Sequence, residues 1–324
     1  MIYVSRTALP SFKNYIKRIK PLWKSHYLTN NGEMVQELEK KLQEYWKVKN
    51  VICVSNGTMA TMLAIKALGI TKEIYVSPYS YISTVSVPTW MGIKTKFIDI
   101  GEKWKGPAIV THVYGAENLQ DVKPVIYDAS HAFCVKHKGK SIVSYGDISI
   151  ISFHAVKIFQ TIEGGALVTN DDRLAKKLRW MRNFGYKTHY SYYGAGINAK
   201  MNEFEAAMGL CSLEQIDKIE KKYALLIKRY NKALGYDYHG LTYYPIWYET
   251  EKNVLKAIKT FEKNGITPRR YFYPPLNKVF NGKACPIAED LMSRVLCIPL
   301  YYDLTTKQQD HIIKIAKQTN GLIN

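Results

Sequence analysis

ISIISFHAVKIFQTIEGGALVTN, residues 148–170, is the stretch from which the fold of this 324-residue chain can be inferred. An apolar, β-branched run ends near Phe153, and Lys157, Gly164-Gly165 and a second apolar run follow it. Such runs are typical of buried strands, so the stretch predicts a strand, a loop and a second strand. Lys157 lies in that loop, just past a strand end, which is where open α/β sheets bind ligands.

A lysine in such a loop has two interpretations. The ordinary one is a solvated charge at the surface. The other is a desolvated amine, the group that forms Schiff bases with carbonyl compounds and with pyridoxal 5'-phosphate, abbreviated PLP. The second interpretation requires the rest of the chain to supply the other parts of a cofactor site.

Strands alternate with helices through the first half of the chain. Short apolar runs occupy residues 51–54, 74–78, 95–100, 108–113 and 125–128, and segments with helical periodicity follow several of them. This alternation predicts an α/β fold with a mainly parallel central sheet flanked by helices. Because the carboxyl ends of parallel strands meet at one edge, the residues that follow these strands are expected to lie together.

Several of those strand ends carry groups suited to a phosphorylated ring. Gly57 and Thr58 follow the strand at 51–54 and open a helix, whose first amides are free to bind phosphate; Thr58 is also explained as an ordinary helix cap. Tyr81 follows the strand at 74–78 and either stacks on a flat ring or belongs to the core. Asp128 ends the strand at 125–128.

PLP needs an amine for its aldehyde, a carboxylate against its pyridine nitrogen, donors for its phosphate and a flat partner for its ring. Lys157, Asp128 and Tyr81 supply three of these, and Gly57-Thr58 with Ser152 supplies the phosphate donors. Each residue alone has an ordinary structural explanation. Their combination at successive strand ends indicates a PLP site.

The length of the chain is enough for two domains. A helical region from Glu203 to Leu234 is expected to lead from a large PLP-binding domain, residues 1–205, into a small C-terminal α/β domain, residues 206–324. In the small domain, Arg269 and Arg270 are candidates for binding the phosphates of a substrate.

The chain is strongly basic, with 46 lysines and arginines against 27 acidic residues and a net charge of +19. Such a charge fits a nucleic-acid-binding protein. However, the basic residues alternate with acids, as in EKKLQEY, and form no long basic arm. We therefore interpret them as solvated helix faces and a basic rim that attracts an anionic small substrate, and expect no nucleic-acid partner.

Other features point to a cytoplasmic protein without membrane partners. No apolar run approaches the ~20 residues of a membrane helix, and the N-terminal segment lacks the pattern of a signal peptide. The five cysteines are scattered and odd in number, which favours free thiols. The spacing His131-x-x-Cys134-x-x-His137 lacks a second ligand pair, so no metal site is expected.

The chain resembles the sugar-nucleotide aminotransferases of the DegT/DnrJ/EryC1/StrS family, which have the aspartate-aminotransferase (type I) PLP fold. The segments that carry the resemblance run through nearly the whole chain: LTNNG, SNGTMATMLAIKALGI, SPYSYISTVSVPTWMGIKTKFIDI, HVYG, VIYDASHAF, SYGDISIISFHAVKIFQTIEGGALVTN, GINAKMNEFEAAMG, ITPRRYFYP and RVLCIPLY.

The resemblance implies a role for each candidate residue. Lys157 holds the aldehyde of PLP and moves protons, Asp128 pairs with the pyridine nitrogen, and His131 lies near the ring hydroxyl. The residues implied to hold the ring and the phosphate are Tyr81, Gly57, Thr58, Ser152 and, from a partner subunit, Asn198. The active form is then a homodimer with shared sites. The residues implied to contact substrate are Thr29, His154, Arg269, Arg270 and Tyr271.

The segments SFHAVKIFQTIEGGA and RRYFYP are most similar to those of the branch that makes 4-amino-4,6-dideoxyglucose (viosamine). That branch uses a nucleotide-linked 4-keto-6-deoxyglucose, with UDP or dTDP as carrier, and L-glutamate as amino donor. Two alternatives stay open: the same chemistry on a 3-keto sugar, and a non-catalytic basic binding protein on this fold. A further branch replaces the lysine with histidine and is a dehydratase, which Lys157 argues against.

The chain departs from the family pattern in two places. The segment between Ile100 and Ala108 is short, and the helix expected before Val125 is reduced to about Leu119–Val122. In addition, Lys200 stands where an arginine is common. We expect these differences to affect stability and dimer details more than the chemistry.

Overall fold

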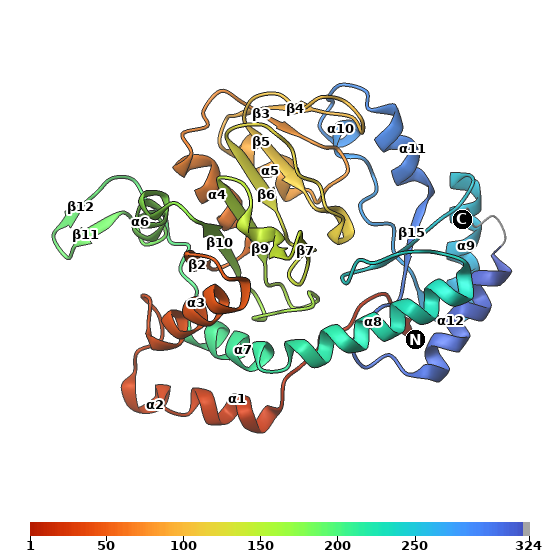
Figure 1. The fold of residues 1–324 in the computed structure, drawn as a ribbon, viewed down its shortest axis with the longest axis horizontal. Coiled ribbons are helices and arrows are strands. Elements are labelled where there is room, and N and C mark those ends of the chain that lie inside the picture. Colours follow the sequence, from red (N-terminus) through yellow and green to blue (C-terminus); the bar gives the residue numbers. More distant parts are fainter. Residues whose placement is uncertain (320–324) are drawn as a thin grey trace.

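A seven-stranded sheet forms the centre of the larger of two lobes (Figure 1). The computed structural model describes residues 1–319. The strands lie in the order β2-β10-β9-β6-β5-β3-β4. Their bounds are β2 (Asn50–Val54), β10 (Gly165–Thr169), β9 (Ile148–Ser152), β6 (Val125–Asp128), β5 (Ala108–Thr111), β3 (Glu73–Val76) and β4 (Lys94–Phe97).

Only one strand of this sheet runs against the others within the described residues. β10 pairs antiparallel with both β2 and β9, whereas the pairings from β9 through β6, β5 and β3 to β4 are parallel. The prediction of a mainly parallel sheet is therefore confirmed. The strand, loop and strand predicted over residues 148–170 are also confirmed, since Gly165 of β10 pairs with Ser152 of β9.

Alternate residues of each strand face two different apolar layers. Val51 and Cys53 pack into one layer with α3 (Glu33–Trp46) and α7 (Glu203–Leu213). Ile52 and Val54 pack into the other, with α4 (Gly57–Ala67), α5 (Ser83–Trp90) and α6 (Asp172–Met181). Burial on both faces explains why these strands are almost continuously apolar in the sequence.

The smaller lobe lies at the far end of the long helix α8 (Ile216–Leu234) (Figure 1). Its sheets are short: β13 (Tyr244–Trp247) pairs with β15 (Val295–Ile298), and β1 (Ile2–Tyr3) pairs with β14 (Ile266–Thr267). Its helices are α9 (Glu251–Lys263), α11 (Pro286–Arg294) and α12 (Thr306–Gln318), whereas α10 (Leu276–Val279) packs on the larger lobe through Leu276.

The helical region expected from residue 203 to 234 is two helices, α7 and α8, separated at Glu214 and Gln215. α7 packs against α3 of the larger lobe, and β1 belongs to the smaller one. The division into residues 1–205 and 206–324 stays a prediction. The packing changes lobe between α7 and α8.

Further elements lie at the edges of the larger lobe. Helices α1 (Phe12–Ile19) and α2 (Leu22–Ser25) precede α3, and a projecting hairpin consists of β11 (Tyr186–Thr188) and β12 (Ser191–Tyr192) (Figure 1). The other short elements are η1 (Val113–Gly115), β7 (Lys136–His137), β8 (Lys140–Ser141) and η2 (Ile142–Ser144). No helix within residues 1–319 is long and apolar enough to cross a membrane.

The remnant helix expected at Leu119–Val122 is not formed, and the prediction is wrong. Residues 116–124 are irregular between η1 and β6. Leu119 and Val122 nevertheless pack with the buried Trp104 against Val110 and Tyr127. A few large side chains thus cover this face of the sheet without helical structure.

Candidate active site

Lys157 and Asp128 lie near each other at the carboxyl edge of the sheet. Lys157 is in the loop between β9 and β10, where its backbone N–H donates to the carbonyl of His154 at 2.9 Å. Burial lowers the pKa of the Lys157 amine to about 8, and the nearby Asp128 carboxylate acts in the opposite direction. A lysine with this pKa has a sizeable neutral fraction at physiological pH, as a nucleophile or base requires.

Asp128 is the last residue of β6 and is buried. One carboxylate oxygen accepts a hydrogen bond from the backbone N–H of Ser130 at 3.0 Å. Burial raises the pKa of Asp128, while the hydrogen bonds from Ser130 and the charge of Lys157 oppose that rise. The carboxyl group is thus held by a hydrogen bond with a cation nearby, and a carboxylate of this kind can pair with a pyridine nitrogen.

His131 completes the inner part of this site. Its Nδ1 accepts a hydrogen bond from the backbone N–H of Tyr114 at 3.2 Å, which leaves the proton of the neutral ring on Nε2. Burial and the positive charge of Lys157 both lower the pKa of His131. The ring is stacked on Phe272 at 5.3 Å and meets the edge of Tyr243 at 5.2 Å. His131 is therefore a neutral donor in a fixed orientation.

The proposed phosphate seat lies where α4 begins. The helix starts at Gly57 and is capped by Asn56, whose side chain accepts from the N–H of Met59 at 2.8 Å. The alternative explanation of Thr58 as the cap is therefore wrong, and its side chain is exposed. A Cβ on Gly57 would lie 3.0 Å from the Cβ of Ser152, so the glycine lets the helix start approach β9 closely.

Hydrogen bonds connect this seat to Asp128. The N–H of Ser152 donates to the hydroxyl of Ser130 at 3.1 Å, and the N–H of Ser130 donates to Asp128. The structure thus brings together Gly57, Ser152 and Asp128, which are far apart in the sequence.

Aromatic rings from both lobes surround the site. Tyr81 is 56% exposed, so the interpretation of this ring as a core aromatic is wrong. It meets the edge of Phe272 at 6.2 Å. The Lys157 amine lies 5.7 Å from the centre of the Tyr243 ring, on which Tyr271 stacks at 4.2 Å. Tyr271 is therefore a wall of the site rather than a free side chain.

Tyr243 and Phe272 were not among the residues expected from the sequence. In the sequence, an aromatic residue of an active site cannot be distinguished from an aromatic residue of the core. The only signal was the number of aromatic residues in RRYFYP. Tyr243 directly precedes β13, and its ring contacts His131 of the larger lobe.

The two arginines of that segment have different surroundings. Arg269 is exposed, and its guanidinium lies 4.9 Å from the centre of the Tyr271 ring. Arg270 is paired with Glu251 at 2.8 Å and also donates to the carbonyl of Ser293 at 2.8 Å. Arg269 is thus available to an anionic ligand, whereas the charge of Arg270 is already neutralised within the smaller lobe.

The remaining candidates lie on exposed segments. Thr29 and His154 are both exposed, and His154 Nε2 lies 3.7 Å from a Glu163 oxygen. Asn198 is exposed between the β11–β12 hairpin and α7, and its side-chain oxygen accepts from Lys200 at 2.6 Å. Exposure leaves all three accessible to a substrate or a second subunit.

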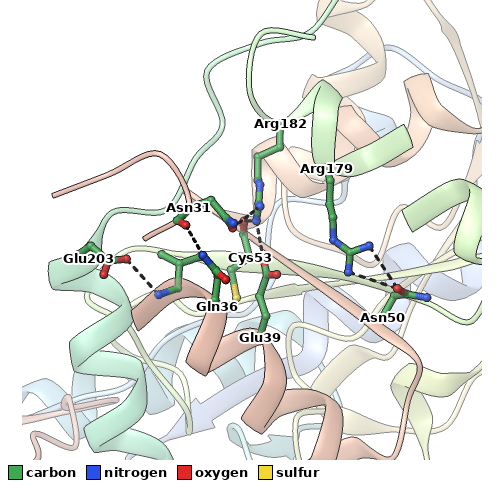
Figure 2. A network of polar contacts seen from close by, with 9 residues as sticks. Asn31, Gln36, Glu39, Asn50, Cys53, Arg179, Arg182 and Glu203 are labelled. Atoms are coloured by element: carbon green, nitrogen blue, oxygen red, sulfur yellow. Dashed lines mark hydrogen bonds and ion pairs between the residues drawn. The ribbon is translucent and has the colours of Figure 1, made fainter. Parts of the chain in front are cut away.

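A buried polar network joins Arg182 to Glu39 and Asn31 (Figure 2). Arg182 pairs with Glu39 and donates to Asn31 at 2.8 Å in the loop that includes Thr29. The carbonyl of Arg182 accepts from the N–H of Ala199 at 3.1 Å, next to Asn198. Glu203 accepts from the first N–H groups of α3, which anchors the same loop from the other side.

The sequence contains one signal for this network. Glu39 falls on the same helical face as Val35, Leu38 and Leu42, all of which are buried. A carboxylate on an apolar face must find a partner, because an unpaired buried charge is costly. The partner's identity, Arg182, was not predictable because it depends on where α6 packs.

Similarity to known proteins shows the family of the chain. The DegT/DnrJ/EryC1/StrS aminotransferase family model matches residues 12–105 and 119–317. The chain is 32% identical to the dTDP-4-amino-4,6-dideoxy-D-glucose transaminase of Shigella dysenteriae, covering 98% of each chain. It is 30% identical to the Escherichia coli O157:H7 GDP-perosamine synthase, covering 91% of this chain and 92% of that one.

Solved structures show the same fold. The crystal structure of DesI in the presence of its TDP-sugar product has a TM-score of 0.90 at 24% identity, covering 98% of this chain and 92% of DesI. Helicobacter pylori PseC, an aminotransferase, has a TM-score of 0.87 at 20% identity, covering 98% of each chain. The fold class inferred from the sequence is confirmed, and the chain belongs to the DegT/DnrJ/EryC1/StrS aminotransferase family.

Proposed function

We propose that this aminotransferase uses PLP to move an amino group from L-glutamate to a nucleotide-linked 4-keto-6-deoxy-D-glucose, with dTDP or UDP as carrier. The product is the corresponding 4-amino-4,6-dideoxyglucose nucleotide, for glycan biosynthesis in the cytoplasm. The observation that carries the proposal is the adjacency of the half-buried Lys157 amine, whose pKa is lowered to about 8, to the buried carboxylate of Asp128. The full-length similarity to the Shigella dysenteriae relative supports the sugar and the position of the amine.

The residues of the site fit PLP. Because residue 57 is a glycine, the start of α4 lies close to Ser152. A Cβ at this position would fill the space that we assign to the phosphate. The outward amides at the start of α4 suit a phosphate, and the exposed ring of Tyr81 is free to cover a flat heterocycle. When bound, PLP supplies an electron sink for the carbon that carries the amino group.

The chain's own residues then have separate tasks. Asp128 stays ionised beside the ring nitrogen and keeps it protonated. Lys157, with a pKa of about 8, takes a proton at one carbon and returns it at another as base and acid. The Nε2–H of His131 donates to the ring hydroxyl, and Arg269 and Thr29 bind the nucleotide sugar together with Tyr271 and His154.

We further propose that the active form is a homodimer. The β11–β12 hairpin projects from the larger lobe (Figure 1) and exposes Tyr186, Tyr190, Tyr192 and Tyr193. Large exposed aromatic clusters mark protein interfaces. Asn198, which follows the hairpin, would then reach the phosphate seat of the partner, so that each site draws on both subunits.

The test is a reaction of purified protein with PLP, L-glutamate and either dTDP- or UDP-4-keto-6-deoxyglucose. We expect a yellow protein and one product, whose mass and NMR spectrum show an equatorial amine at C4. Lys157→Ala should abolish turnover, whereas Lys136→Ala, at an exposed site, should not. A colourless protein that is indifferent to Lys157→Ala contradicts the proposal, and amination at C3 would replace the proposed substrate by the 3-keto sugar.

A further inference from the structure

A cleft of about 910 Å³ lies beside the edge strand β4, away from Lys157. It is lined by β4, by residues 102–105 of the connection to β5, and by residues 280–283 after α10. β5 and β3 separate β4 from β6, which ends in Asp128, so the two sites are about 14 Å apart at the usual strand spacing. The cleft is therefore distinct from the candidate active site.

The connection between β4 and β5 shapes one wall of this cleft. It contains no helix, and its two buried large apolar side chains, Ile98 and Trp104, pack on the sheet beside Val110 and Tyr127. The neighbours Lys103 and Lys105 are exposed and line the cleft. Anchoring by Trp104 thus directs two lysines into the same open space.

Positive charge is concentrated in the cleft. Five lysines line it, and two of them have carboxylate partners: Lys96 with Glu73 at 3.9 Å, and Lys283 with Glu102 at 2.5 Å. The other three, Lys94, Lys103 and Lys105, have no acidic partner within 4.0 Å in residues 1–319. Clustered lysines in a concave site raise the local concentration of anions.

Hydrogen-bond donors of β4 are also available there. The N–H groups of Lys94 and Ile98 donate to β3 and its flank, so the alternating N–H groups of Thr95 and Phe97 point to the open edge. The Thr95 hydroxyl is buried and has no hydrogen-bond partner within the described part of the chain. Buried polar groups are nearly always bonded, so an unpaired one in a cleft wall suggests a missing acceptor.

Aromatic rings line the cleft on both sides of the edge strand. Tyr75 lies on the face that carries Trp104, whereas Phe97 and Phe280 lie together on the opposite face and form what we call the aromatic wall. A ligand that combines an anion with a flat ring therefore matches both kinds of surface. The volume lies within the range of small-molecule sites.

We propose that this cleft binds a nucleoside diphosphate, with its phosphates on Lys94, Lys103 and Lys105 and its base against the aromatic wall. A compact ligand fits better than an acidic peptide added as a strand to β4. A Cβ on Gly282 would lie 2.2 Å from the Phe97 ring, so the backbone of residues 281–283 already covers that end of the strand. The site is separate from the proposed transamination and does not depend on it.

The test uses the PLP-loaded full-length chain and measures acylation of individual lysines by mass spectrometry. We expect ADP or dTDP to slow acylation of Lys94, Lys103 and Lys105 by about fivefold or more at low salt, and high salt to remove the effect. Lys256, an exposed lysine of α9, is the internal control and should react equally with and without nucleotide.

Variants separate the parts of the site. Thr95→Val should weaken nucleotide protection by roughly tenfold, the usual worth of a hydrogen bond to a charged group. Thr260→Val, on the exposed face of α9, is the matched control and should leave protection unchanged. If Thr95→Val impairs folding, the triple exchange of Lys94, Lys103 and Lys105 to Gln should lower the number of dTDP molecules bound per chain in calorimetry by one relative to wild type.

Three results would overturn the proposal. One is unchanged acylation of the three lysines at millimolar nucleotide. Another is equal protection by inorganic pyrophosphate and by the nucleotides, which would leave the aromatic wall without a role. The third is protection by an oligoglutamate peptide in place of nucleotide, which would assign the cleft to an acidic segment of a protein.

Discussion

Two opposing effects act on the amine of Lys157. Removal from water favours the neutral form, and the Asp128 carboxylate favours the charged form. The pKa of Lys157 falls from 10.5 to about 8, so desolvation is the larger effect. The same balance that prepares the amine for chemistry must lower the stability of the cofactor-free protein.

The first prediction concerns pH and Lys157→Met. Because the folded pKa of about 8 lies below the unfolded value of 10.5, the unfolded chain holds more protons between these values, and stability rises with pH there. Without cofactor, Lys157→Met should be more stable than wild type by about 1–2 kcal/mol at pH 7, allowing for the partial exposure of the side chain. The difference should shrink towards pH 10. Urea unfolding at both pH values checks this, and a pH-independent difference would contradict it.

The second prediction concerns Asp128→Asn. The amide cannot hold the ring nitrogen of PLP in its protonated form, so kcat should fall by roughly 100-fold or more, the usual effect of losing one preorganised electrostatic partner. Steady-state kinetics with the keto sugar provide the measurement. Asp121→Asn, at an exposed position, is the matched control and should retain activity.

At the scale of elements, the site depends on how closely α4 approaches the β9–β10 hairpin. Gly165 opens β10 and lies directly under the start of α4. A Cβ at this position would lie 2.7 Å from the backbone of Asn56 and 2.8 Å from the nitrogen of Gly57. Backbone atoms cannot rotate away, so any side chain here must displace the helix end.

The third prediction is that Gly165→Ala weakens PLP binding while leaving the fold intact. Overpacking of this kind costs about 1–3 kcal/mol, and displacement of the α4 amides should raise the Kd for PLP. Absorbance titration with PLP and urea unfolding measure the two effects. A variant with wild-type PLP affinity would show that the α4 amides do not hold the phosphate.

The fourth prediction concerns the Arg182–Glu39 pair that joins α6 to α3. Both side chains are almost completely buried. Glu39→Ala leaves the Arg182 charge unpaired and should lower the free energy of unfolding by about 3–5 kcal/mol. Lys41→Ala, which breaks the exposed pair with Glu37 one turn away, should cost less than about 1 kcal/mol. Similar losses in the two variants would contradict the assigned burial.

At the scale of the whole molecule, the exposed aromatic residues of the hairpin form a surface that we expect a partner to bury. Tyr190 is 97% exposed, and Tyr186, Tyr192 and Tyr193 lie around the same hairpin. α1 and α2 expose Phe12 and Trp23 as well. The partner that we propose is a second copy of the chain.

The fifth prediction is therefore that the double variant Tyr190→Ser, Tyr192→Ser shifts the protein from dimer to monomer and lowers activity. Light scattering after size-exclusion chromatography measures the mass. Trp90→Ser, at a residue that is 87% exposed on α5, is the control and should remain dimeric. Dimers of the hairpin variant with full activity would place the interface elsewhere.

The sequence predicted the parts of the fold that depend on local pattern. Strand periodicity located β9 and β10, and the alternation of strands and helices predicted the carboxyl edge with Asp128 and Lys157. The helix cap is Asn56 rather than Thr58, because α4 starts two residues before the apolar pattern from which the helix was predicted. The identity of a cap depends on the first residue of the helix. The Arg182–Glu39 pair and the Tyr243 wall depend on tertiary packing, which no local pattern contains.

The pairing of β1 with β14 has a consequence for biosynthesis. Residues Ile2 and Tyr3 are synthesised long before their partners Ile266 and Thr267. This strand pair of the small lobe therefore cannot form until the larger lobe between them has been made. Deleting Ile2 and Tyr3 would damage a lobe whose other elements all follow α7 in the sequence.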